Sequence, residues 1–464
     1  MKCEVFTNPF KNNTTMRKKI YSFIAGILIL ASTASLNAQC AGLRYHDYIF
    51  PTVPTPTSNV VYGSNVDKSG VTQSLKLDVY QPVGDTSSGR ALVIIAHGGS
   101  FYTGSKTGTD VAPLAKSFAK MGYVTASIDY RLGMTNFPFA DATAGAAGHT
   151  VDSSDAGAAV MRAVHDGRAA IRFFRKNVAT GGNTYKIDTN KIFFAGVSAG
   201  GFIALHIAYM DLLSEFPAYV DTTGINSGTR HGQLGISGGL EGNSGNPGYS
   251  SKVKAIINIC GALGDTAWMS PGNTPVLSFH GTNDATVPYG SATIYLAGSF
   301  PLLVVDGSYS VAAQANILGI ENCFVTWPGQ DHVPEVGTSA NAVAHYDSTI
   351  VISRNFLEHY TCGIALNCNY TTALATLSIN DIASDADFSI YPNPTYNSAT
   401  IDLSQFNGKE VTIELYDALG RQSKNITNIK TDKYVLQRDN LQSGIYFMNV
   451  LVDGKRFSKK IIFE

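Results

Sequence analysis

The sequence has few charged residues and no surplus of either sign. Charged residues make up 15% of its 464 residues, against about 25% in typical soluble domains. Lys and Arg number 34 and Asp and Glu 35, which gives a formal net charge of -1. A nucleic-acid-binding protein is expected to carry a basic surplus or a basic stripe. The balance therefore argues against that class, and we expect no nucleic-acid partner.

Cysteine is also scarce, with six residues and no CxxC pair. Structural zinc sites usually need such paired spacing, so we expect no structural metal. Cys362 and Cys368 are near enough in the chain to close a short loop. Cys260 and Cys323 adjoin predicted strands, where a buried thiol fits as well as a disulfide. The pairing stays open at this point.

The N-terminal segment has the pattern of a secretory signal peptide. Basic residues at 17–19 precede an apolar run at 20–31, and small and polar residues follow up to Ala38. The run is shorter than the roughly 20 residues that span a bilayer. We predict a signal peptide over residues 1–38, with a signal anchor as the alternative. Because residues 1–15 are polar, we hypothesise that translation starts at Met16.

Export has a consequence for the cysteines. Removal of the signal peptide takes Cys3 with it and leaves an odd number of cysteines in an oxidising compartment. At least one cysteine is then expected to stay free or to pair between chains.

The segment between about residues 60 and 360 alternates strand-like and helix-like patterns. Short apolar runs bounded by turn residues are typical of central strands that are covered on both faces; they occur at 91–96, 123–128, 192–195, 253–259, 276–279 and 323–327. Helix-like stretches occupy 110–121, 158–177, 199–211 and 340–359. We therefore predict an α/β catalytic domain over 39–360, with a mostly parallel central sheet flanked by helices.

Three long segments interrupt this alternation, at 133–155, 214–251 and 281–321. Loops of this length are expected to be either lids or substrate-pocket loops, or simple decoration of the surface, and the third segment is expected to contain one further helix. Ligands of such a sheet bind at the carboxyl ends of its strands.

The first candidate catalytic residue is Ser198, in the sequence Gly196-Val197-Ser198-Ala199-Gly200. This GxSxG pattern follows an apolar strand and opens a helix, which is the setting of a nucleophile elbow. Glycines on either side allow a sharp turn that presents the hydroxyl at the edge of the sheet. We predict that Ser198 is a nucleophile.

A serine nucleophile needs a base, and the base needs a group that orients it. Asp284 lies in the loop after the strand at 276–279, and His332 follows the strand at 323–327. The chain order Ser198, Asp284, His332 is the order expected of α/β-hydrolases. Asp331 and Asp265 are alternative orienting acids. The remaining histidines considered, His206, His280, His345 and His359, are expected to have structural roles.

The strand at 91–96 ends in His97-Gly98-Gly99-Ser100-Phe101. Backbone N–H groups that stabilise an oxyanion are expected at such a glycine turn. We assign the oxyanion hole to Gly98, Gly99, Ser100 and Ala199, with N–H donors from Ala199 and from one or both of Gly99 and Ser100. Phe101 and Tyr102 are predicted to line the substrate site.

Six motifs occur here in the order found in one protein family: HGGSF at 97–101, SIDYRL at 127–132, HDGRAAIRFFR at 165–175, GVSAGG at 196–201, HGTNDATVP at 280–288 and GQDH at 329–332. Together they resemble α/β-hydrolases of the esterase and lipase type, of the hormone-sensitive-lipase-like or feruloyl-esterase-like branches. The resemblance implies hydrolysis of carboxylic esters by a serine mechanism without a cofactor. Ser100 stands where many relatives have a third glycine.

The last part of the chain has a different pattern. After a predicted linker at 361–387, short alternating strands separated by turn residues run through 388–464. This predicts a small β-sandwich, and Asp453-Gly454 indicates a hairpin between its last two strands. A carbohydrate-binding module is an alternative, with Tyr391, Tyr396 and Tyr446 as its aromatic residues.

Four pieces of this module resemble the C-terminal sorting domain of type IX secretion in Bacteroidetes: YPNP at 391–394, LYDALGR at 415–421, LQSGIY at 441–446 and KKII at 459–462. The resemblance implies a partner, the type IX secretion machinery, and a protein that is secreted or held on the outer cell surface.

The predicted function is a secreted serine hydrolase that cleaves carboxylic esters of short acyl, acetyl or feruloyl type through an acyl-enzyme. Its substrate is a small or polymer-linked ester. The alternatives are a serine peptidase of the prolyl-oligopeptidase type, which shares this catalytic domain, and a surface protein that keeps the fold without activity.

Overall fold

The computed structural model describes residue 40 and residues 43–134, 153–217, 234–296, 300–368, 388–417, 422–453 and 455–464. The chain forms two units, Met1–Cys368 and Asn369–Glu464. The predicted signal peptide at 1–38, most of the loop at 133–155, part of the loop at 214–251 and most of the linker at 361–387 lie outside the described residues.

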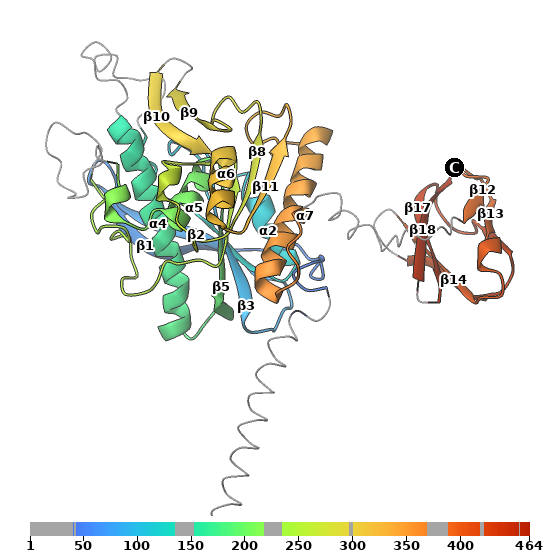
Figure 1. The fold of residues 1–464 in the computed structure, drawn as a ribbon. Coiled ribbons are helices and arrows are strands. Elements are labelled where there is room, and N and C mark those ends of the chain that lie inside the picture. Colours follow the sequence, from blue (N-terminus) through green and yellow to red (C-terminus); the bar gives the residue numbers. More distant parts are fainter. Residues whose placement is uncertain are drawn as a thin grey trace, which may run out of the picture. The chain divides into compact units, whose positions relative to one another are not determined.

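The first unit is built on an eight-stranded sheet in the order β1-β2-β4-β3-β5-β6-β8-β11 (Figure 1). Its strands are β1 (Thr57–Val66), β2 (Thr72–Tyr80), β3 (Arg90–Ala96), β4 (Val124–Ile128), β5 (Ile187–Val197), β6 (Ile256–Ile259), β8 (Val276–Gly281) and β11 (Asn322–Trp327). The pairs β1–β2 and β2–β4 are antiparallel, and all other neighbours are parallel. The mostly parallel sheet confirms the predicted fold class.

Helices lie on both faces of this sheet: α2 (Ala112–Lys120), α4 (Ser153–Thr180), α5 (Ala199–Tyr209), α6 (Ser308–Leu318) and α7 (Ala340–Cys362). From β3 the chain passes through α2 to β4 on one side, and then through α4 back across β3 to β5. Because such crossovers are right-handed, α2 and α4 cover opposite faces. α5 contacts α4, and α7 contacts α2.

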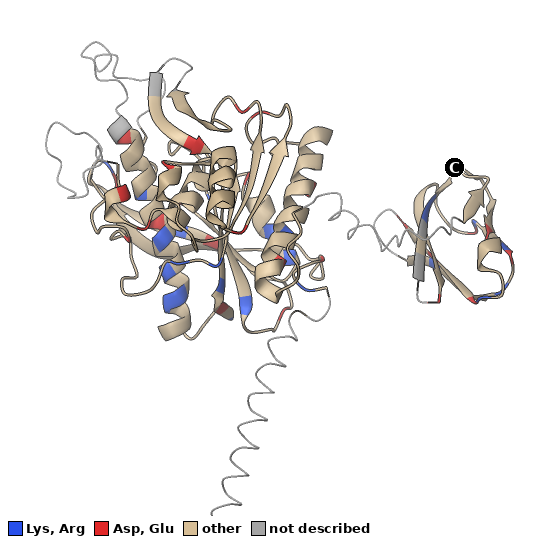
Figure 2. Ribbon diagram, in the orientation of Figure 1, with Lys and Arg blue, Asp and Glu red and all other residues tan. Residues whose placement is uncertain are grey.

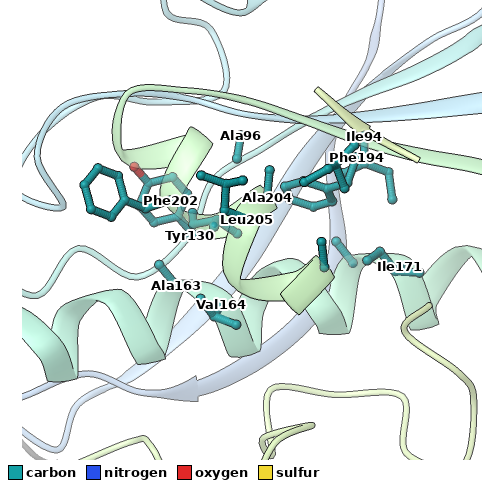
Figure 3. Packing of buried hydrophobic residues seen from close by; sticks show 14 of the residues in the cluster. Ile94, Ala96, Tyr130, Ala163, Val164, Ile171, Phe194, Phe202, Ala204 and Leu205 are labelled. Atoms are coloured by element: carbon teal, nitrogen blue, oxygen red, sulfur yellow. The ribbon is translucent and has the colours of Figure 1, made fainter. Parts of the chain in front are cut away.

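The core lies between the sheet and the helices. Every residue of β3, β4, β6 and β8 is buried, as expected for central strands covered on both faces. Figure 3 shows side chains of α4 and α5 meeting those of the sheet, with Ala163, Val164, Leu205 and Phe194 among them. Figure 2 shows several basic residues along α4; two of them, Arg168 and Arg172, pair with Glu241.

The segment at 281–321 departs from the prediction. It contains the expected helix, α6, but also the hairpin of β9 (Ser291–Leu296) and β10 (Phe300–Gly307). The hairpin joins β7 (Ala262–Leu263) in a separate three-stranded sheet. Because β10 contacts α4 and α6 and the hairpin is not part of the central sheet, it does not follow from the alternation of strands and helices.

The cysteines pair in a way that the sequence did not indicate. Cys40 is bonded to Cys362 and Cys323 to Cys368, and Cys260 is free and buried. The short loop between Cys362 and Cys368 is therefore not closed by a disulfide. Among the cysteines that the structure describes, one remains free, in line with the odd number expected after export.

The second unit consists of two antiparallel sheets with the orders β12-β13-β16 and β15-β14-β17-β18. Its strands are β12 (Ser389–Tyr391), β13 (Ser398–Asp402), β14 (Val411–Asp417), β15 (Gln422–Ile429), β16 (Lys433–Gln437), β17 (Gly444–Val452) and β18 (Lys455–Phe463). Ile413, Leu415, Met448 and Val450 belong to its own buried cluster. Val452 pairs with Lys455, as the hairpin at Asp453-Gly454 predicted.

No helix within the described residues has the length and the apolar character that crossing a membrane requires.

Candidate active site

Ser198 occupies a strained turn between β5 and α5. Its φ of 53° and ψ of −116° are unfavourable for a residue with a side chain. A Cβ atom on Gly196 would lie 1.9 Å from the carbonyl oxygen of Gly200, and one on Gly200 would lie 2.0 Å from that of Ala96. Only glycine fits at both positions. The turn brings Ser198 to the carboxyl ends of the central strands.

Ser198, His332 and Asp284 form a chain of hydrogen bonds. His332 Nε2 lies 2.8 Å from Ser198 Oγ, and His332 Nδ1 lies 2.7 Å from Asp284 Oδ2. An ionised carboxylate can only accept, so Nδ1 carries the proton and Nε2 is left to accept from the hydroxyl group. The arrangement can pass a proton from the serine hydroxyl to the imidazole ring.

The carboxylate of Asp284 is buried and strongly stabilised in its charged form. Burial raises its pKa, but hydrogen bonds from His280 and His332 outweigh this effect and hold the pKa well below its usual range. His280 Nε2 lies 3.2 Å from Asp284 Oδ2. The backbone N–H groups of Thr286 and Val287 donate to Oδ1 over 2.9 and 2.8 Å. Asp284 is therefore ionised at neutral pH.

The alternative acids have other partners. Asp331 is exposed and accepts the N–H groups of Ala285 and His332. Asp265 caps the short 3₁₀ helix η2 (Thr266–Trp268) by accepting the N–H of Ala267. Neither carboxylate is hydrogen-bonded to the His332 ring among the described residues.

The alternative histidines also bond elsewhere. His206 contacts the carbonyl oxygen of Phe202, His345 that of Asn341 and His359 that of Ile364. His280 is buried between Ser308 Oγ and the Val287 carbonyl oxygen. Its additional contact with Asp284 gives it a supporting place in the site that the sequence did not indicate.

The glycine turn after β3 lies against the nucleophile. A Cβ atom on Gly98 would lie 3.2 Å from Ser198 Cβ. Gly99, Ser100 and Phe101 all have positive φ values, of 110°, 53° and 55°. Within the part of the chain that the structure describes, the N–H groups of Gly99, Ser100 and Ala199 take part in no hydrogen bond.

One predicted oxyanion-hole residue has to be corrected. The N–H group of Gly98 donates to Asp110 Oδ2 over 2.7 Å, so it is not available to an oxyanion. Gly98 contributes close approach of the backbone instead. Asp110, which no motif marked, orients this turn.

Tyr130 of the SIDYRL motif packs against the same glycine turn. Its hydroxyl donates to the carbonyl oxygen of His97 over 2.8 Å, and its ring stacks on His97 at 4.3 Å. Phe101 is buried and its ring meets that of Phe202 edge-on at 6.1 Å. Tyr102 is 39% exposed. Of the two predicted substrate residues, Phe101 therefore packs in the core and Tyr102 lies at the surface.

A cavity of about 740 Å³ reaches this part of the molecule through Phe202, while Ser198, Asp284 and His332 are not among the described residues that line it. Phe202, one helical turn after Ser198, forms part of its wall together with His206, Phe216 and Trp268. Apolar residues of α4 and β10 also line the cavity, among them Val160, Met161, Leu303 and Val305. The ring of Trp268 lies over Gly264, where a Cβ atom would come within 2.4 Å of the indole.

Two further groups belong to this region, the thiol of Cys260 and the carboxyl group of Glu335, and no sequence motif indicated either of them. The thiol of Cys260, a carboxylate oxygen of Asp284 and a ring nitrogen of His332 lie within 4.8 Å of one another. Glu335 is 5% exposed, three residues after His332. A buried acid at that position follows only from how the loop packs.

Two sequence-family models match this chain, one in each of its two structural units. A family model described as BD-FAE matches residues 77–144 and 152–296. The chain carries an esterase-like BD-FAE domain. This domain makes the protein a carboxylic ester hydrolase, and it contains Ser198, Asp284 and the glycine turn after β3.

A second family model, described as a secretion system C-terminal sorting domain, matches residues 389–464. This is the sorting domain of type IX secretion, so the enzyme is secreted or displayed on the outer surface. The type IX secretion machinery is therefore a partner of the chain. The match also decides against a carbohydrate-binding module at this end.

Solved structures similar to this chain include forms of esterase 2 from Thermogutta terrifontis. The form phosphorylated by paraoxon is 22% identical, with a TM-score of 0.45, and the match covers 67% of this chain and 96% of that one. The apo form is 21% identical, with a TM-score of 0.45, over 67% and 97% of the two chains. The propionate-bound form is 20% identical, with a TM-score of 0.43, over 69% and 98%. No curated protein matches the sequence.

Proposed function

We propose that the BD-FAE domain of this chain hydrolyses esters through an acyl-enzyme on Ser198. The observation that carries the proposal is the hydrogen-bonded chain from Ser198 Oγ through His332 to Asp284, with both links at 2.7 to 2.8 Å. Asp284 keeps the proton on Nδ1, which leaves Nε2 as the base.

The first half of the reaction forms the acyl-enzyme. Ser198 Oγ bonds to the ester carbonyl carbon while its proton moves to His332 Nε2, and the carbonyl oxygen becomes an oxyanion. The N–H groups of Ala199, Gly99 and Ser100 are the proposed donors to it, each contributing on the order of 3 kcal/mol. The intermediate then expels the alcohol, which takes its proton from His332.

The second half repeats these steps with water. Water adds to the acyl carbon as His332 takes its proton, and the bond to Ser198 breaks. Ser198 regains a proton from His332, and the free acid leaves. The ionised Asp284 stabilises the imidazolium ion in both halves. The steps balance without a cofactor.

The cavity at Phe202 and Trp268 bears on the acyl group. Its wall holds the aromatic rings of Phe202, Phe216 and Trp268, apolar side chains and two acids, Glu215 and Asp265, and it is far larger than an acetyl group requires. Among the ester classes considered, this supports a bulky or aromatic acyl group of feruloyl type. Acetyl and other short acyl esters remain substrates in this proposal because they fit the same space.

The test measures turnover of p-nitrophenyl esters from acetate to decanoate and of methyl ferulate by the full chain. Ser198→Ala is expected to lower kcat/KM by at least about 10³-fold. Ser270→Ala, at an exposed serine, is the matched control and should behave as the wild type. Ester turnover that survives in Ser198→Ala would refute the serine mechanism. Cleavage of prolyl peptides without ester turnover would favour the peptidase alternative.

A further inference from the structure

Glu335 is a buried acid that the proposed reaction does not use. It is 5% exposed, and among the described residues neither of its carboxyl oxygens has a hydrogen-bond partner. An ionised carboxylate buried in this way is costly unless it is paired. The residue lies in the loop that carries His332, so its state bears on the position of the base.

Acidic groups from three other elements act electrostatically on Glu335. Asp110 approaches from the segment before α2, Asp284 from the loop after β8 and the thiol of Cys260 from the end of β6. Burial, with smaller contributions from Asp110 and Asp284, raises the pKa of Glu335 to about 7. Electrostatic attraction to its own backbone N–H, which makes no hydrogen bond with the carboxyl oxygens, opposes this rise only in part. The carboxyl group is therefore neutral in acid and ionises near neutrality.

The loop that joins His332 to Glu335 is strained. Val333 has a φ of 44°, which a β-branched residue rarely adopts. The N–H of Val336 donates to the carbonyl oxygen of Val333 over 3.1 Å and closes a turn around Glu335. Strain of this kind persists only where the surrounding packing holds it. Within the turn, the buried side chain of Glu335 contributes to the packing that holds this strained conformation.

We propose that Glu335 is a positioning residue whose neutral carboxyl group anchors the His332 loop, and that its ionisation releases the loop and lowers ester hydrolysis. The charge that forms would face Asp110, Asp284 and Cys260, and on its own loop His332. Hydration of that charge requires the turn at 333–336 to move outward. His332 Nε2 then leaves its position 2.8 Å from Ser198 Oγ. This inference rests on the proposed function.

The test compares pH profiles of kcat/KM between pH 6 and 9 for the full chain, with the p-nitrophenyl ester that it hydrolyses fastest. The wild type is expected to lose at least fivefold between pH 7 and 9. Glu335→Gln should stay within twofold of its pH 7 value, because glutamine cannot ionise. Glu321→Gln is the control, because Glu321 is an exposed glutamate next to the other end of β11; it should follow the wild type.

Two results would overturn the inference: the same alkaline loss in Glu335→Gln, or a folded Glu335→Gln enzyme without activity at pH 7. Should that variant not fold, hydrogen exchange of wild-type residues 328–340 decides. After correction for intrinsic exchange, protection should fall between pH 6 and 8.5 in this segment alone, and unchanged protection contradicts the proposal. Ser198→Ala, assayed in parallel, separates the two ideas, because activity there would refute the serine mechanism itself.

Discussion

Arg131 and Asp166 form an ion pair from which solvent is fully excluded. Arg131 Nη2 lies 2.7 Å from Asp166 Oδ1, both side chains are 0% exposed, and Arg131 Nε contacts both carboxylate oxygens at 3.0 and 2.9 Å. Arg131 also donates to the carbonyl oxygens of Val66 and Gly235, over 2.7 and 2.8 Å. One guanidinium group thus joins the end of β4 to α4, to the end of β1 and to the segment that begins at residue 234.

Removing the acid of this pair should destabilise the first unit. Asp166→Ala leaves the buried guanidinium without its counter-charge, and we expect the free energy of unfolding to fall by about 3–5 kcal/mol. Urea unfolding measures the change. Asp347→Asn, at an exposed position on α7, should alter it by less than about 0.5 kcal/mol. Equal effects of the two substitutions would contradict the structural role of the pair.

Gly200→Ala should damage both stability and activity. The new Cβ atom would lie 2.0 Å from the carbonyl oxygen of Ala96, which is backbone and cannot rotate away. Overpacking of this kind costs at least about 1–3 kcal/mol, and the shift it forces displaces Ser198. Thermal unfolding and ester turnover check both effects. Gly290→Ala is the control, since its nearest atom is 4.0 Å away; an active, stable Gly200→Ala would contradict the proposed packing.

Asp284→Asn should lower kcat by about 10⁴-fold if Asp284 fixes the tautomer of His332. An asparagine NH₂ facing Nδ1 favours the tautomer with the proton on Nε2, which cannot accept from Ser198. Steady-state kinetics at pH 7.5 tests this. Asp265→Asn, which changes the alternative acid, should lower kcat far less, because Asp265 lines the cavity beside Trp268 and caps η2 without bonding to the His332 ring. A larger loss of kcat in Asp265→Asn than in Asp284→Asn would assign the orienting acid to Asp265.

The low pKa of Asp284 predicts a loss of stability in acid. Its folded-state pKa lies well below the ordinary value of 3.8, so the carboxylate stabilises the fold above that pH. This contribution disappears as the pH falls from 3.8 toward the folded-state pKa. Thermal unfolding between pH 5 and 2.5 should show a smaller decline for Asp284→Asn than for the wild type. Equal declines in the stability of the two proteins would show that the hydrogen bonds to Asp284 do not stabilise the fold.

Glu335 predicts the opposite dependence on pH. Its pKa is raised from 4.5 to about 7 in the folded state, so the unfolded chain ionises first. The wild type should therefore lose stability as the pH rises from 4.5 to 7. Glu335→Gln should escape this loss and exceed the wild type at pH 8 by on the order of 3 kcal/mol. Denaturant unfolding at pH 5 and 8 measures the difference, and an equal effect at both values would contradict it.

Much of the first unit follows from local patterns. The apolar runs of β3 and β8 lie in a sheet covered on both faces, and each of their residues is buried. The predicted helices at 110–121 and 199–211 correspond to α2 (Ala112–Lys120) and α5 (Ala199–Tyr209). Such segments are predictable because burial and periodicity are both written in short stretches of sequence.

The candidate site was predictable where residues sit directly at strand ends. Ser198 follows β5, Asp284 follows β8 and His332 follows β11, and parallel strands bring their carboxyl ends to one edge. Asp110 and Glu335 escaped prediction because nothing near them in the chain distinguishes them from surface or core residues, and the contact of the structural residue His280 with Asp284 was not foreseen. Their partners come from other loops.

The sequence by itself determined the parallel α/β unit, the strained serine turn, the order of the hydrogen-bonded residues and the sorting domain, because each depends on neighbours within a few residues. Only the tertiary structure decided that Cys40 pairs with Cys362, that β9 and β10 form a hairpin, that Asp110 occupies the N–H of Gly98 and that Glu335 is buried beside acidic groups. These features depend on contacts between segments far apart in the chain, and such contacts are set by the packing of the whole unit.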